Sequence, residues 1–231
     1  MNVLLFGASG MIGQGVLREC LLDAQVTSVV AVVRRPLGFT HPELREIVHQ
    51  DFTDFSSLAG QFESVDACFF CLGVSSAGRS EEEYRRITYD YTLAAARALP
   101  TNPSLTFVYV SGEGTDSTES GRSMWARVKG RTENELLAMP FHAYMFRPGY
   151  IQPLHGATSR TPLYRWLYVG LSWLYPLLRR VLPRHVTTTE NLGRAMLAVA
   201  RPGGAGERIL YSPEINRAAA QAAEGRKSAG R

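Results

Sequence analysis

A glycine-rich turn that begins at residue 7 constrains the fold of this chain more than any other feature. The stretch Gly7-Ala8-Ser9-Gly10-Met11-Ile12-Gly13 separates an apolar run at 3–6 from a segment with helical spacing at 12–21. In such a unit the first glycine allows a tight turn, the second lets the backbone approach a pyrophosphate, and the third lets the helix pack closely on the strand. The free N–H groups at the helix N-terminus attract an anion. The pattern favours a dinucleotide site over an ordinary turn, with contacts from Gly7, Ser9, Gly10, Met11, Ile12 and Gly13.

Apolar runs alternate with helical patterns along the chain, which predicts an α/β fold with a doubly wound parallel sheet, the Rossmann arrangement. The run at 26–33 is apolar almost throughout, as expected of a parallel strand buried on both faces. A chain of 231 residues with 45% hydrophobic and 20% charged residues can bury a full core. The expected strands are 3–6, 26–33, 46–49, 67–72, 106–110, 144–146 and 207–211, and the expected helices are 12–21, 55–62, 80–99, 124–138 and one that begins at 187–190.

We expect a single domain over 1–215, with a small helical substrate or lid lobe at 151–182, and a flexible tail at 216–231. The tail is predicted because it is rich in Ala, Gly, Gln, Arg and Lys and has almost no large apolar side chains. Leucines and aromatic residues crowd 163–182, but the uninterrupted apolar part, 166–178, is shorter than the roughly 20 residues that span a bilayer. This stretch is interpreted as a lid or homodimer face, and the alternative is a surface for an apolar substrate or a peripheral membrane contact.

The net charge and the cysteine content indicate which kinds of partner and which cellular compartment to expect. The formal net charge of +4 is mild, and several cations lie in the last residues, so no nucleic-acid partner is required. Three cysteines suggest a reducing compartment, and we expect a cytoplasmic protein without a signal peptide and without a metal site. Cys68 and Cys71 have the spacing of a redox motif but lie in an apolar strand-like run. Positions i and i+3 of a strand point to opposite faces, so the two thiols should not meet.

Two arginines stand where a dinucleotide fold reads the adenosine ribose. Arg34 and Arg35 follow the second expected strand, at the place where NAD-binding proteins carry an acidic residue. A guanidinium pair suits a 2′-phosphate, so the sequence predicts NADP (NADPH) as the cofactor over a solvated basic pair. Asp51 follows the third expected strand. It either accepts a hydrogen bond from the adenine amino group or caps a local turn.

Taken in order, these motifs resemble an atypical short-chain dehydrogenase/reductase, in the branch of Tat-interacting-protein-like and NAD-dependent epimerase/dehydratase-like proteins. The resemblance covers roughly residues 1–215. It rests on the glycine turn, Arg34, Asp51, Gly73 after the fourth strand, Ser111 after the fifth, Lys129, and Arg147-Pro148-Gly149. It implies further cofactor contacts at Phe52, Leu72, Gly73, Lys129, Pro148 and Gly149.

The same resemblance assigns two catalytic residues and exposes a departure. It implies that Ser111 orients a substrate carbonyl and that Lys129 holds the nicotinamide ribose. The tyrosine that serves as general acid in this family would fall at position 125, where this chain has Trp125. An indole N–H can donate a hydrogen bond but does not give up its proton near neutral pH. The usual proton relay is therefore broken.

Other residues could supply the proton, and they leave two hypotheses open. The candidates near the nicotinamide pocket are Tyr84, Tyr89, Glu113, Tyr150 and His155, of which His155 is the best placed. The first hypothesis is an NADPH-dependent oxidoreductase that acts on a small, fairly apolar carbonyl compound. The second is a non-catalytic NADPH-binding redox sensor or protein-interaction module.

Overall fold

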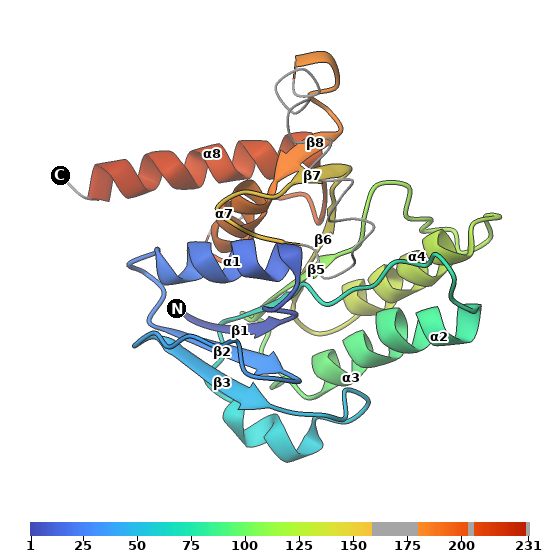
Figure 1. Cartoon of the computed structure of the whole chain (residues 1–231), viewed down its shortest axis with the longest axis horizontal. Helices are drawn as coiled ribbons and strands as arrows, with labels where there is room; N and C mark the ends of the chain where they lie inside the picture. Colours follow the sequence, from blue (N-terminus) through green and yellow to red (C-terminus); the bar gives the residue numbers. More distant parts are fainter. Residues whose placement is uncertain (159–179, 203–205, 230–231) are drawn as a thin grey trace.

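The computed structural model describes residues 1–158, 180–202 and 206–229 of the chain. A seven-stranded parallel sheet with the order β3-β2-β1-β4-β5-β6-β9 forms its centre (Figure 1). The doubly wound parallel sheet predicted from the sequence is confirmed. The strands of this sheet are β1 (Asn2–Phe6), β2 (Ser28–Val33), β3 (Leu44–Val48), β4 (Ala67–Phe70), β5 (Thr106–Val110), β6 (His142–Arg147) and β9 (Ile209–Tyr211).

Helices cover both faces of the sheet. The helical elements are α1 (Met11–Leu21), η1 (Ser56–Gln61), α2 (Glu81–Arg85), η2 (Arg86–Asp90), α3 (Tyr91–Arg97), α4 (Met124–Leu137), α7 (Thr189–Val199) and α8 (Ser212–Ala229). One face packs against α1, α7 and α8, and the other against η1, α3 and α4. Figure 1 shows α8, α7 and α1 in succession above the sheet, with α2, α3 and α4 on its other side.

The core follows from strands that are apolar on both sides. In β4, Ala67 and Phe69 point into one core cluster, and Cys68 and Phe70 point into the other. Cys71 packs against the cluster on the face opposite to Cys68, and both cysteines are free thiols. The prediction that the two thiols do not meet is confirmed.

Three parts of the fold differ from the sequence expectations. The expected helix at 55–62 is a 3-10 helix, η1. The expected helix at 80–99 is interrupted by a π-helical turn, η2, between α2 and α3. A short parallel pair, β7 (Tyr150–Gln152) and β8 (Val186–Thr188), joins two segments that the sequence did not pair.

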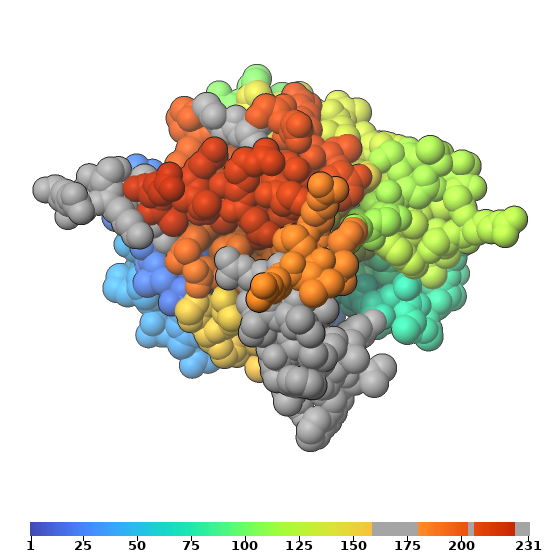
Figure 2. Space-filling model, turned by 90° about the horizontal axis from the view of Figure 1, so that it is seen from above, coloured from blue at the N-terminus to red at the C-terminus, as the bar shows by residue number. Residues whose placement is uncertain are grey.

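The predicted flexible tail is wrong over most of its length. Residues 212–229 form the helix α8, which lies across the upper surface in Figure 2. Asn216, where the tail was expected to begin, accepts hydrogen bonds from Thr187 (2.7 Å) and Asn191 (2.9 Å) and donates to the Val186 carbonyl (2.9 Å). Ile215, Ala218, Ala219 and Ala222 are buried in the core. Alanine side chains are large enough to fill this part of the core, because α8 packs directly on α7.

The predicted lobe at 151–182 and the apolar stretch at 163–182 fall mainly in 159–179, outside the described residues. Among the helices of the described ranges, none is both long enough and apolar enough to cross a membrane.

Candidate functional site

The glycine turn forms a close-packed junction between β1, β4 and α1. Gly7 has a φ of +81°, and a Cβ at this residue would lie 2.6 Å from the Leu72 nitrogen. A Cβ on Gly13 would lie 2.0 Å from the Gly7 carbonyl oxygen, so α1 can approach the turn only at a glycine. The Gly10 N–H donates to the Gly7 carbonyl at 2.9 Å. These contacts explain the positions of the first and third glycines by packing alone.

The N-terminus of α1 is open to an anion. Gly10 is its N-cap in an extended conformation, and no side chain in the described part of the chain caps the helix. The first N–H groups of an α-helix have no partner within the helix, and they carry the positive end of its dipole. The structure therefore fits a pyrophosphate here. The Gln14 side chain donates to the Ser9 carbonyl (3.1 Å) and accepts from the Thr158 N–H (3.2 Å), which ties the loop after β7 to this turn.

The residues predicted to read the adenosine end lie at the carboxyl ends of β2 and β3. Arg34 and Arg35 are exposed. Asp51 accepts hydrogen bonds from the side chain (2.5 Å) and the N–H (2.9 Å) of Thr53, and these bonds hold the pKa of its carboxyl below the usual value. It thus caps a local turn. The Phe52 side chain is buried in the core, so only its backbone is left to contact a ligand.

A pocket of about 610 Å³ opens beside the glycine turn. It lies where the loop between β2 and β3, which contains no helix, passes beside α1. Its walls include Ala8 and Ser9 of the turn, Gln14 and Arg18 of α1, and Leu37 and Phe39 of the loop.

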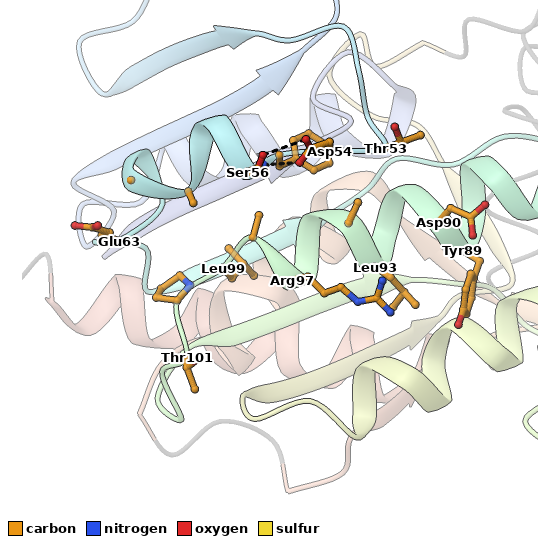
Figure 3. A pocket seen from close by; sticks show the side chains of 16 residues that line it. Thr53, Asp54, Ser56, Glu63, Tyr89, Asp90, Leu93, Arg97, Leu99 and Thr101 are labelled. Atoms are coloured by element: carbon orange, nitrogen blue, oxygen red, sulfur yellow. Dashed lines mark hydrogen bonds between the residues drawn. The ribbon is translucent and has the colours of Figure 1, made fainter.

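A second hollow, of about 770 Å³, lies between η1 and α3 (Figure 3). Polar residues such as Asp54, Glu63, Asp90 and Arg97 line it together with Leu93. Tyr89 contributes to its wall, but none of the residues predicted to bind the cofactor does. This hollow is separate from the glycine turn.

Lys129 and Ser111 meet at the end of β5. The Lys129 Nζ donates a hydrogen bond to the Ser111 carbonyl. Burial lowers the pKa of Lys129 to about 8, against an opposing effect of the Glu133 carboxylate. The Ser111 hydroxyl is buried and donates to the Phe146 carbonyl of β6 at 3.1 Å. The two predicted catalytic residues are therefore brought together, with the serine hydroxyl directed at the neighbouring strand.

Trp125 lies one helical turn before Lys129, at the start of α4. Its indole packs against the loop after β5, because a Cβ on Gly114 would lie 3.2 Å from the Trp125 Cη2. Gly114 has a φ of +85°, which favours glycine at this point of the loop.

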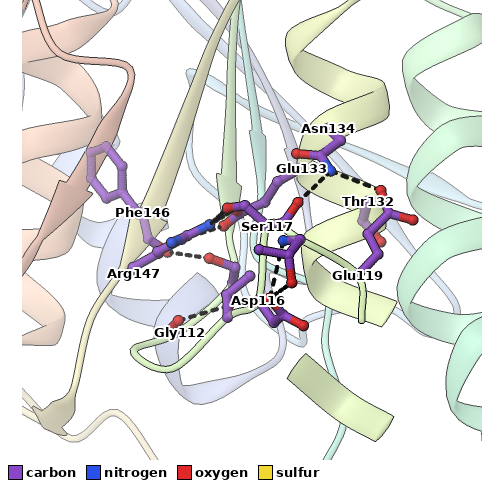
Figure 4. A network of polar contacts seen from close by, with 12 residues as sticks. Gly112, Asp116, Ser117, Glu119, Thr132, Glu133, Asn134, Phe146 and Arg147 are labelled. Atoms are coloured by element: carbon purple, nitrogen blue, oxygen red, sulfur yellow. Dashed lines mark hydrogen bonds and ion pairs between the residues drawn. The ribbon is translucent and has the colours of Figure 1, made fainter. Parts of the chain in front are cut away.

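A buried ion pair between Glu133 and Arg147 fastens α4 to β6 (Figure 4). The Arg147 Nε lies 3.1 Å from both carboxylate oxygens of Glu133, and the two side chains are 7% and 0% exposed, respectively. Arg147 also donates to the Ser117 hydroxyl (2.5 Å) and the Tyr211 hydroxyl (3.0 Å). Glu133 lies one helical turn after Lys129 on α4. By holding α4 on β6, this network also sets the position of Lys129 relative to the end of β5.

The sequence reasoning missed the partner of Glu113. The Glu113 Oε1 lies 2.5 Å from the Nδ1 of His185, which directly precedes β8. The Glu113 N–H donates to the Pro148 carbonyl at 2.9 Å, and the Tyr150 N–H donates to the His185 carbonyl at 2.7 Å. A lone histidine before a three-residue strand gives no sequence signal, since its place depends on the pairing of β7 with β8.

The other candidate proton donors are engaged elsewhere. Tyr84 is buried, and burial raises its pKa. Tyr89 donates to Glu135 (3.3 Å), and Tyr150 donates to Gln152 (2.9 Å). His155, the candidate favoured from the sequence, pairs with Glu190 at the start of α7.

Comparisons with known proteins agree with this geometry. A family model described as NAD(P)H-binding matches residues 7–150. The chain is 30% identical to protein HTATIP2 of Rattus norvegicus over 154 residues, which is 65% of this chain and 62% of the rat protein. It is 31% identical to the mitochondrial protein FMP52 of Saccharomyces cerevisiae over 165 residues, which is 70% of this chain and 69% of that protein.

Solved structures agree on the fold. A short-chain dehydrogenase/reductase family oxidoreductase from Burkholderia thailandensis superposes with a TM-score of 0.69 at 18% identity, covering 96% of each chain. MoeE5, solved in complex with UDP-glucose and NAD, superposes with a TM-score of 0.67 at 19% identity, covering 97% of this chain and 81% of MoeE5. The glycine turn, the open α1 terminus and the family match lead to one conclusion: this chain belongs to the NAD(P)H-binding family and is an atypical short-chain dehydrogenase/reductase-like Rossmann protein.

Proposed function

We propose that the protein is an NADPH-dependent oxidoreductase that reduces a small, fairly apolar carbonyl compound. The observation that carries the proposal is the hydrogen bond from Lys129 to the Ser111 carbonyl at the end of β5. This bond and the uncapped N-terminus of α1 both lie where the strands of the sheet have their carboxyl ends. Ligands of open α/β sheets bind outside the carboxyl ends of the strands. A dinucleotide whose pyrophosphate lies at α1 would extend along this edge toward Lys129.

The preference for NADPH over NADH rests on Arg34 and Arg35. Both side chains are exposed at the end of β2, so they are free to turn toward a 2′-phosphate beside Ser9. A charge-assisted bond from a guanidinium to a phosphate contributes about 1.5–3 kcal/mol. No acidic residue stands at this point to accept a ribose hydroxyl.

Calorimetric titration with NADPH and NADH tests the preference. We expect NADPH to bind at least 10-fold more tightly than NADH, and Arg34→Ala to remove most of that difference. Arg97→Ala, which removes an exposed arginine at the end of α3, is the charge-matched control and should leave it unchanged. Equal affinities in the wild-type protein, or an unchanged preference in Arg34→Ala, would remove the argument.

Within this function, Lys129 is assigned to the nicotinamide ribose and Ser111 to the substrate carbonyl. Bound NADPH would supply the hydride, and the protein would hold the substrate and supply a proton. Trp125 stands in the place of the usual tyrosine and cannot supply that proton. The reaction therefore needs another donor.

A second candidate function is a non-catalytic NADPH-binding sensor or interaction module. It is favoured by Trp125 and by the Ser111 hydroxyl. That hydroxyl donates its hydrogen bond to the Phe146 carbonyl and does not point toward the expected substrate. NADPH oxidation in the presence of a panel of aldehydes and ketones separates the two. Tight binding of NADPH without turnover of any carbonyl supports the sensor.

A further inference from the structure

We propose that His185 is the proton donor that replaces the missing tyrosine, and that Glu113 positions its imidazole ring. This inference rests on the proposed reductase function and names the group that completes it. The observation behind it is the close contact of the His185 Nδ1 with the Glu113 Oε1, at 2.5 Å, which joins the end of β5 to the start of β8 beside Pro148 and Gly149.

The backbone around the pair is shaped to hold it. Gly112 has a φ of +147°, which directs Glu113 over the end of β6, where its N–H binds the Pro148 carbonyl. A Cβ on Gly149 would lie 2.4 Å from both the Glu113 Oε2 and the His185 carbonyl oxygen. A side chain at 149 would therefore displace both members. The glycine leaves the space that the pair occupies.

The pair also lies close to the two residues assigned to the reaction. Gly112 separates Glu113 from Ser111 in the chain. A Cβ on Gly112 would lie 3.7 Å from the Lys129 Nζ and 4.0 Å from the Pro148 carbonyl oxygen. Lys129, Ser111, Glu113 and His185 thus gather at the carboxyl ends of β5 and β6.

The chemistry of the pair suits proton donation. A carboxylate on Nδ1 fixes the ring orientation and stabilises the imidazolium, which leaves Nε2–H as the donor. In the reduction, a hydride from NADPH forms a bond to the carbonyl carbon, and the proton from Nε2 forms a bond to the carbonyl oxygen. NADPH leaves as NADP⁺, the carbonyl becomes an alcohol, and the neutral imidazole takes a new proton from water. With 53% of the His185 side chain and 38% of the Glu113 side chain exposed, water reaches the ring.

The test compares His185→Gln and Glu113→Gln with His142→Gln, which changes an exposed histidine at the amino-terminal end of β6. Each protein is titrated with NADPH by calorimetry, and its NADPH-dependent reduction of 4-nitrobenzaldehyde, acetophenone and methylglyoxal is followed. We expect NADPH affinity to stay within about 2-fold in all three variants. The maximal rate should fall roughly 10²–10⁴-fold in His185→Gln, fall less in Glu113→Gln, and stay unchanged in His142→Gln.

Two further measurements exclude a merely structural role. Imidazole added to His185→Gly should restore part of the rate, because a free imidazole can occupy the vacated space and donate the proton. In the free wild-type protein, a ring N–H resonance of His185 should lie downfield, as expected for a bond to a carboxylate, and Glu113→Gln should abolish it.

The outcomes separate this proposal from the function on which it rests. A wild-type protein that does not bind NADPH overturns the proposed function and this proposal with it. NADPH binding without reduction of any of the three carbonyl probes overturns the proton donor and supports the non-catalytic candidate. Reduction that persists in His185→Gln, or His185→Gly without rescue by imidazole, overturns the donor role alone.

Discussion

Lys129 is partly buried, and the reduced hydration of its ammonium group leads to a prediction about stability. Burial favours the neutral amine and lowers the pKa from 10.5 to about 8. Between these two values the unfolded chain binds more protons than the folded chain, so the free energy of unfolding rises with pH in this window. Below about pH 8 the folded protein bears the full cost of a buried charge.

We expect Lys129→Met to be more stable than the wild type at pH 7, by an amount that shrinks as the pH rises from about 8 to 10.5. Methionine fills a similar volume and has no charge to desolvate. Urea unfolding at pH 7, 8, 9 and 10 gives the difference, because other groups titrate in both proteins and cancel. A difference that stays constant over this range would contradict the burial of the ammonium group.

The buried pair of Glu133 and Arg147 gives a second prediction at this scale. Glu133→Gln leaves the Arg147 guanidinium buried without its counter-charge, and should lower the free energy of unfolding by about 3–5 kcal/mol. Glu135→Gln, two residues further along α4, alters an exposed carboxylate and should cost less than about 1 kcal/mol. Chemical denaturation of both variants checks this. Equal losses would mean that the ion pair is not desolvated.

Single residues also show how far the sequence could be read. The roles of Gly7 and Gly13 follow from the motif, since the strand–turn–helix context fixes their geometry. His185 and Glu113 could not be joined, because nothing near either residue in the chain points to the other. The burial of Phe52 and the Asx turn at Asp51 likewise depend on packing and on local hydrogen bonds that the motif does not encode.

At the scale of elements, α1 and α7 cross at two glycines. A Cβ on Gly15 would lie 2.6 Å from the Thr189 Cβ, and a Cβ on Gly193 would lie 2.8 Å from the Glu19 Cβ. Because the helices approach closely, the fully buried Glu19 carboxylate accepts a hydrogen bond from the Arg194 Nε at 3.1 Å. This contact holds the helix whose N-terminus faces the expected pyrophosphate.

Gly193→Val should therefore lower the free energy of unfolding by about 1–3 kcal/mol through overpacking, and should weaken NADPH binding as α1 shifts. Gly60→Ala is the control, because a Cβ at Gly60 meets no atom within 4 Å. We expect that control to be neutral or slightly stabilising. Thermal unfolding and calorimetry give both quantities. A stable Gly193→Val variant with unchanged affinity would show that the helices can separate without consequence.

The long apolar runs made the central strands predictable, because burial on both faces leaves a strong pattern. Short elements escaped. β7 and β8 have three residues each, too few for a period of two to stand out, and their pairing joins distant segments. The π-helical turn η2 was hidden for a similar reason, since one extra residue hardly changes a helical pattern.

At the scale of the whole molecule, α8 changes what the end of the chain is expected to do. A protein ending at Arg217 loses Ala218, Ala219 and Ala222 from the core. Burying three methyl groups contributes roughly 2 kcal/mol, and the lost helix adds to this. We expect the Tm to fall by several degrees in a thermal scan. An unchanged Tm would restore the prediction of a flexible tail.

Two neighbouring alanines provide a sharper version of this experiment. Ala219 is 2% exposed and faces α7, whereas Ala220 is exposed on the same helix. Ala219→Asp places a carboxylate in the core and should be strongly destabilising, while Ala220→Asp should be nearly neutral. Similar Tm values for the two variants would contradict the packing of α8.

The contact between α1 and α7 also affects how the protein folds during its synthesis. The bond from Arg194 to Glu19 spans 175 residues of sequence, so the first helix receives its covering from a part of the chain that is synthesised much later. At about 5–20 residues per second on the ribosome, α7 is synthesised on the order of 10 seconds or more after α1. Contacts of such high sequence separation slow folding. In the nascent chain, α1 therefore lacks its contacts with α7 until Arg194 has left the exit tunnel.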